Sequence, residues 1–87
     1  MPEISRFFGI IIYMFPDDHN PPHFHAKYGD DKAMIHIKSG EIMEGKMTRR
    51  ALRLIQDWTE LHQQELLENF ELLRQENKTY FPVEPLK

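Results

Sequence analysis

The chain has 87 residues, of which 40% are hydrophobic, with a formal net charge of −3 and no cysteine. This length allows one domain with a small core, and we expect a homodimer or a fixed partner to add stability. The lack of thiols excludes disulfides, cysteine-ligated zinc and cysteine nucleophiles, and the negative charge disfavours general nucleic-acid binding.

The apolar segments of the chain are too short to cross a membrane. None approaches the roughly 18 residues that a transmembrane helix needs. The opening Met-Pro-Glu-Ile-Ser-Arg also lacks the basic start of a signal peptide. We therefore expect a cytoplasmic protein with no membrane partner.

The first predicted element is a β-strand over residues 4–15. It is rich in β-branched and aromatic residues at both odd and even positions, a pattern typical of a strand that is buried on both faces. Gly9 inside this run indicates a bulge or a close backbone approach, and Pro16 ends the strand.

Two half-buried strands are predicted after a loop over residues 17–22. Apolar and polar residues alternate over residues 23–28 and again over residues 32–38, with a Gly-Asp-Asp turn between the two runs. Residues 41–44 form a possible short fourth strand.

The register of this hairpin is limited by its apolar residues, which must face the same side. Two pairings meet this condition, one with Tyr28 opposite Ala33 and the other with Tyr28 opposite Asp31. Either pairing places His23, His25 and His36 on the polar face of the sheet.

A helical pattern with a period of 3.6 residues begins after Thr48, which is a good N-cap residue. Two apolar lines run along residues 48–77, rotated from each other by about a quarter turn. One long helix fits this pattern, and so does a helical pair broken near residues 62–64. The second half would outreach a small sheet, so we expect it to pack on a second copy or a partner.

These elements predict a single α+β domain over residues 1–87. A small, mostly antiparallel sheet of three to four strands occupies residues 4–45, and the helical region packs on it. Residues 78–87 form an extended tail marked by prolines. The adjacent Tyr80 and Phe81 indicate that this tail is docked and does not extend freely into solvent.

The loop before the second predicted strand carries the densest chemistry of the chain. Three of the five histidines, namely His19, His23 and His25, fall within seven residues of one another, beside Asp17 and Asp18. Two prolines stiffen the backbone between them. Because residues two apart on a strand share a face, His23 and His25 point to the same side.

Five segments of the sequence resemble the small prokaryotic domain-of-unknown-function family four-one-six-zero. The most specific of them is the loop motif DDHNPPHFH, and the others are residues 4–10, 40–46, 49–54 and 65–70. The resemblance covers nearly the whole chain and implies no established activity. Members often sit beside a second small domain in toxin–antitoxin-like pairs, so it implies a small cognate partner protein.

Three functions are compatible with the loop. The first is a metal-independent, ribonuclease-like activity on RNA, in which His25 acts with His23 or His36 as general base and acid. Cations near this surface would stabilise phosphate charge, and the candidates are Lys27, Lys38 and Arg49.

The second function is a divalent metal site for Zn, Ni, Mn or Fe. Its ligands would be His19, His23 and His25, with Asp18 or Asp17 as a further ligand or as a support. The third is a non-enzymatic interaction module, in which the histidines only satisfy the loop by hydrogen bonding to aspartates and backbone carbonyls.

Overall fold

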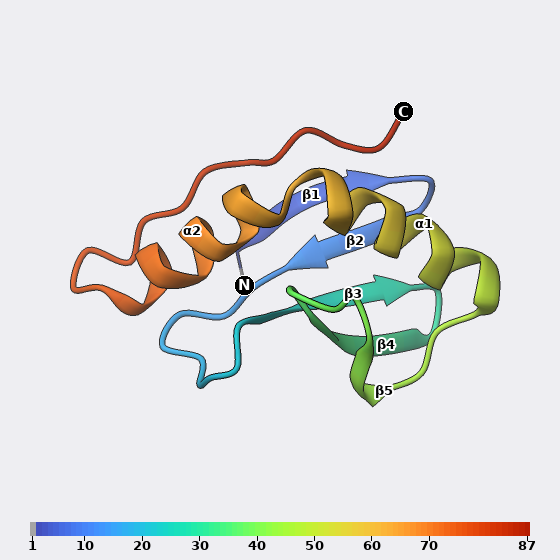
Figure 1. Cartoon of the computed structure of the whole chain (residues 1–87), viewed down its shortest axis with the longest axis horizontal. Coiled ribbons are helices and arrows are strands. Elements are labelled where there is room, and N and C mark those ends of the chain that lie inside the picture. The colour runs from blue at the N-terminus through green and yellow to red at the C-terminus, as the bar shows by residue number, and fades with distance from the viewer. Residues whose placement is uncertain (1) are drawn as a thin grey trace.

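The computed structural model describes residues 2–87 and shows a five-stranded antiparallel sheet followed by two helices. The elements are β1 (Glu3–Phe7), β2 (Ile10–Tyr13), β3 (His23–Tyr28), β4 (Asp31–His36), β5 (Ile42–Gly45), α1 (Arg49–Leu61) and α2 (Gln63–Arg74). The strands lie side by side in chain order, α1 lies across one face of the sheet, and α2 continues from it toward the loop before β3 (Figure 1).

The predicted α+β class is confirmed, but the predicted count of three to four strands is wrong. The run over residues 4–15 folds back on itself at Phe8 and Gly9, which have φ angles of 49° and 80°. Two successive positive φ values match the twist of a two-residue hairpin. The run is therefore two strands, with Phe7 paired to Ile10, because Gly9 provides a turn where a bulge or a close backbone approach was expected.

The central hairpin adopts the second of the two predicted registers. Tyr28 pairs with Asp31, and His23 pairs with His36. Phe24, Ala26, Ala33 and Ile35 are buried in the core beneath the helices. The alternating residues His25, Lys27, Lys32 and Met34 therefore lie on the opposite face of the sheet, which we call the open face.

The helical region is a broken pair, with the break at His62. Thr48 caps α1 by accepting a hydrogen bond from the Ala51 backbone amide at 3.2 Å. Within α2, Leu66, Phe70 and Leu73 are buried in the chain's own core. The expectation that this second half packs on another molecule is therefore wrong, because the loop before β3 and the tail provide its contacts within the same chain.

The C-terminal tail packs on its own chain. The buried side chain of Asn69 donates to the Phe81 carbonyl at 2.8 Å and accepts from the Phe81 amide at 2.9 Å. The Val83 amide donates to the Ile4 carbonyl, so the tail also covers the edge of β1. No helix among residues 2–87 is long and apolar enough to span a membrane.

Gly45 provides a test of how tightly β5 is held. It has a φ of +87°, and an added Cβ would lie 2.2 Å from the Lys32 carbonyl oxygen. We expect Gly45→Ala to lower the free energy of unfolding by about 3 kcal/mol or more, measured by urea denaturation. Gly29→Ala is the control, because it is also strained at a φ of +60° but meets nothing within 4 Å. Equal losses in the two variants would contradict this packing.

Asn69 provides a test of tail docking. Asn69→Leu keeps the side-chain size but leaves the Phe81 amide and carbonyl without partners, so we expect a loss of about 2 kcal/mol in unfolding free energy. Limited proteolysis should then cut the tail faster. Glu68→Leu, at the adjacent exposed position, should change neither measurement. An unchanged cleavage rate in Asn69→Leu would show that the tail is held by other contacts.

Candidate functional site

The loop between β2 and β3 is held in place by α2 and the residues after it. The Asp17 amide donates to the Leu73 carbonyl at 3.2 Å, and Arg74 donates to the Asn20 side chain at 3.1 Å. The Asp17 carboxylate also forms an ion pair of 2.6 Å with Lys78. These contacts explain why a loop without secondary structure, whose Asn20–Pro21 peptide bond is cis, can hold its side chains in a defined place.

Asp18, His23 and His25 come together at the base of this loop. The Asp18 Oδ2 atom lies 2.9 Å from His23 Nε2 and 3.2 Å from His25 Nε2. The three ligand atoms all lie within 4.8 Å of one another. His23 is buried, whereas Asp18 and His25 are partly exposed. The site is therefore anchored in the protein but accessible from one side.

Both ring nitrogens of His23 face oxygen atoms. Nδ1 lies 2.8 Å from the Pro21 carbonyl oxygen, which can only accept, so Nδ1 carries a proton and donates it. Nε2 then faces the Asp18 carboxylate, which is also an acceptor when ionised. Two acceptor oxygens therefore face the ring, so the contact between Nε2 and Asp18 Oδ2 needs one shared proton or a cation.

The charge of Asp18 is stabilised by the two histidines. Burial acts to raise the pKa of this carboxyl, but the His25 hydrogen bond, the charge of His23 and the hydrogen bond from the His19 amide together hold the pKa below its usual value. Asp18 therefore stays ionised and available as an oxygen ligand.

Aromatic side chains surround His25 on the open face. Its ring stacks on Tyr13 at 5.3 Å and meets the edge of Phe15 at 4.7 Å. Tyr13 lies directly opposite His25 in the register, and burial raises the pKa of its hydroxyl. Phe70 of α2 packs on the other histidine, His23, at 5.6 Å. These three aromatic residues were not anticipated as part of the site, although Tyr13 and Phe15 both lie in the run over residues 4–15 that the pattern marked as a strand.

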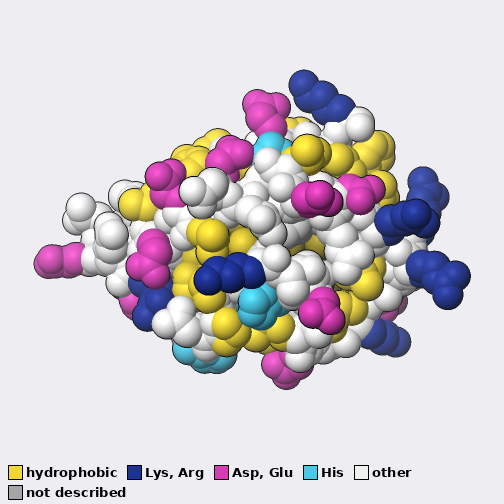
Figure 2. Space-filling view, in the orientation of Figure 1, with side chains coloured by type: hydrophobic (Ala, Val, Ile, Leu, Met, Phe, Trp, Pro, Cys, Tyr) yellow, Lys and Arg dark blue, Asp and Glu magenta, His cyan; other side chains and the backbone are white. Residues whose placement is uncertain are grey.

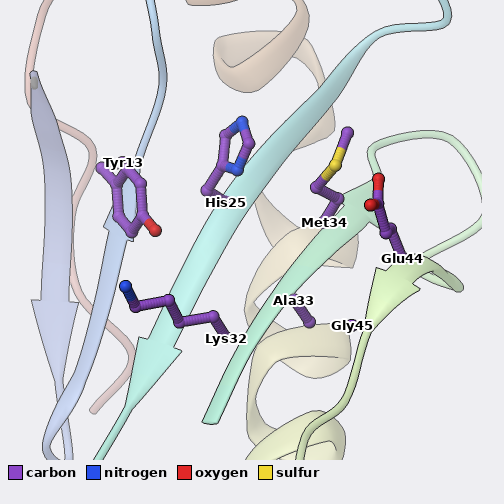
Figure 3. A pocket seen from close by; sticks show the side chains of 7 residues that line it. All are labelled: Tyr13, His25, Lys32, Ala33, Met34, Glu44 and Gly45. Carbon is purple, nitrogen blue, oxygen red and sulfur yellow. The ribbon is translucent and has the colours of Figure 1, made fainter. Parts of the chain in front are cut away.

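A hollow of about 240 Å³ opens on the open face beside His25 (Figure 3). Tyr13, His25 and Lys32 line one side of it, and Met34 and Glu44 line the other. These side chains come from four neighbouring strands. The hollow therefore gives a small ligand direct access to one member of the histidine–aspartate cluster.

The other three histidines of the chain lie outside the cluster. His19 is exposed, with its ring centroid 5.7 Å from that of His23, and its Nδ1 donates to the Asn20 carbonyl at 3.1 Å. His36 pairs with His23 across the strands, but its Nδ1 faces the Ser39 amide at 3.4 Å. His62, at the helix break, bonds Glu65 at 2.6 Å and belongs to the helices.

The predicted phosphate-binding cations do not converge. Lys27 lies on the open face, two residues beyond His25. Lys38 lies at the turn after β4, where its backbone carbonyl accepts a hydrogen bond from Gln63 of α2. Arg49 begins α1 at the opposite end of the molecule from the loop (Figure 1). Figure 2 shows Lys and Arg side chains gathered at that end.

One comparison with known proteins gave a match. A family model described as Domain of unknown function (DUF4160) matches residues 9–71 of the chain. The matched region runs from the β1–β2 turn into α2 and includes the loop with its histidines. No curated protein and no solved structure matches the chain.

Asp18 provides a test of the electrostatics of the metal-free site. Because its pKa is lowered in the folded state, its ionised form stabilises the fold above the pKa of the unfolded chain, and this contribution is lost as the pH falls through the folded value. In EDTA, we expect Asp18→Asn to be less stable than the wild type at neutral pH, and the gap to close on acidification below about pH 4. Urea denaturation from neutral to acidic pH measures the difference in unfolding free energy between the two proteins. A difference that does not change with pH would contradict a stabilising role for the Asp18 charge.

Proposed function

The chain belongs to the DUF4160 family, and from its site we propose that it is a divalent-metal-binding domain whose ion is held by Asp18, His23 and His25. The observation that carries the proposal is that one carboxylate oxygen and two imidazole nitrogens lie within 4.8 Å of one another. A cation among these atoms would replace the proton that the contact between His23 Nε2 and Asp18 otherwise needs.

The separations between the ligand atoms fit a metal site. With metal–ligand bonds of about 2.1 Å, ligand atoms lie about 3.0 Å apart in an octahedral site and about 3.4 Å apart in a tetrahedral one. The two contacts of Asp18, at 2.9 and 3.2 Å, are close to these values. The three ligand atoms all lie within 4.8 Å of one another, so the two histidine nitrogens are separated by no more than this distance.

The surroundings of His23 also fit a ligand. A metal-binding histidine usually donates its second ring N–H to a carbonyl or a carboxylate, which fixes the tautomer and aims the other nitrogen at the metal. The Pro21 carbonyl does this for His23. His19 has the same kind of bond at Nδ1, which leaves its Nε2 lone pair available as a further ligand if the loop closes.

The donor set indicates the class of metal and its use. Two imidazoles and one carboxylate suit Zn²⁺, Mn²⁺, Ni²⁺ or Fe²⁺ better than Ca²⁺ or Mg²⁺. Three protein ligands leave positions for water or a substrate, as in catalytic sites, whereas structural zinc sites are closed by four. The hollow beside His25 would give a substrate access to those positions.

The two-component role that the resemblance implies is a separate proposal. Its support is the resemblance itself, and exposed apolar side chains such as Phe8, Leu61 and Tyr80 are available to a small partner. Expression of the chain alone, with and without His25→Gln, tests it. Growth arrest that depends on His25 would make this chain the toxic half of such a pair.

Metal titration tests the metal site directly. Protein stripped with EDTA and dialysed should bind one equivalent of Zn²⁺ or Co²⁺, and Co²⁺ should give visible absorption bands of a coordinated ion. We expect His25→Gln and Asp18→Asn to weaken binding by at least about tenfold, because each removes a ligand.

His36→Gln is the matched control, because His36 pairs with His23 across the strands but lies outside the ligand cluster. It should bind the metal as the wild type does, and circular dichroism should confirm that each variant is folded. Wild-type protein that binds neither ion would reject the metal site and leave the cluster as hydrogen bonding that holds the loop.

A further inference from the structure

Two lysines face each other across the open face without an ion-pair partner. Lys27 of β3 is registered directly opposite Lys32 of β4. Like charges at directly opposed positions of a sheet destabilise it. Among residues 2–87, the acidic groups that pair with lysines do so elsewhere, at Asp31 with Lys46 and at Asp17 with Lys78. A local conflict of this kind is typical of a functional position, since the fold gains nothing from it.

The lysine pair lies next to the histidine–aspartate cluster. Lys27 follows His25 by two residues on the same strand and face, which places their Cα atoms about 7 Å apart. Lys32 lines the hollow that His25 also lines. In Figure 3, the Lys32 side chain extends across β3 toward Tyr13, whose hydroxyl points into the same space.

The neighbouring charges leave these two ammonium groups free for a ligand. Arg6 lies on the same transverse row of the sheet, since it pairs with Ile11, which pairs with Lys27. The Arg6 guanidinium, however, is held by the Glu3 carboxylate at 2.7 Å. The acid of the hollow, Glu44, comes from β5, two strands from Lys27 and next to the strand of Lys32, but among residues 2–87 it forms no ion pair with either lysine.

We propose that Lys27 and Lys32 together bind the phosphate group of a phosphate ester on the open face, beside the metal held through His25. Two ammonium groups and a hydroxyl donor match the charge and the several acceptor oxygens of phosphate. The contact between the phosphate ester and the metal rests on the proposed metal site. The contact with the two lysines does not, because the lysine pair needs no metal. The ion would neutralise Asp18, so it should strengthen phosphate binding.

The test is a titration monitored by amide chemical shifts, with inorganic phosphate as one probe and a single-stranded oligouridylate of about ten nucleotides as the other. Each probe is added to protein in EDTA and to protein with one equivalent of Zn²⁺. We expect saturable shifts at Lys27 and Lys32 in EDTA and tighter binding with Zn²⁺. In the double variant Lys27→Gln/Lys32→Gln, affinity should fall at least about tenfold.

Lys38→Gln/Arg49→Gln is the matched control, because it removes the same charge from cations outside the lysine pair. Its affinity should stay within about twofold of the wild type. No saturable shift for either probe in EDTA, or equal losses of affinity in the two double variants, would overturn the proposal.

Binding in EDTA that Zn²⁺ leaves unchanged would support the phosphate site and reject the metal contact. Tighter binding of the oligouridylate would identify the ester as part of a strand, and equal affinities would identify it as a small molecule.

A second measurement separates a binding role from a structural one. Because Lys32 repels Lys27 in the free protein, Lys32→Gln should raise the urea midpoint while it weakens phosphate binding. A lower midpoint would show that Lys32 stabilises the sheet, which would also overturn the proposal.

Discussion

A single carboxylate, that of Asp18, receives two imidazole nitrogens, and the rest of the site is arranged around this shared contact. The two histidines belong to β3, whereas the aspartate belongs to a loop that has no strand pairing to hold its backbone. The contact therefore exists only if the loop is held against the start of β3. That constraint accounts for the backbone and side-chain bonds that α2 and the residues after it make to the loop.

The helix α2 acts on the site without supplying a donor atom to it. Phe70 packs on the His23 ring, the Leu73 carbonyl fixes Asp17, and Arg74 fixes Asn20. The same helix is secured from behind by the tail, through Asn69 and Phe81. The tail therefore supports α2, α2 supports the loop, and the loop positions Asp18. Loosening the tail should make the side chains of the site less well ordered.

The sheet has one face that packs against the core and the open face, which carries the candidate site. Helix α1 covers the first side, where Phe24, Ile35 and Trp58 are buried. The other side carries the hollow, His25 and the opposed lysines. Apolar burial on the first face stabilises the fold, so the second face can hold polar and charged groups that add nothing to stability. A metal would bind between His23 and Asp18, and an anion would reduce the repulsion between Lys27 and Lys32.

The sequence alone determined the elements that depend on local patterns. Alternation in residues 23–28 and 32–38 predicted the hairpin and limited it to two registers, and the 3.6-residue period predicted a helical region that was either one long helix or a pair broken near residues 62–64. It also placed His23 and His25 on one face. Tertiary structure alone decided which register formed, that Gly9 makes a turn, and that α2 packs on the loop. These depend on which surfaces meet, and local spacing does not encode that. Asp18 shows the limit: the sequence put it near the histidines, but only the packing of the loop against α2 aimed its carboxylate at both rings.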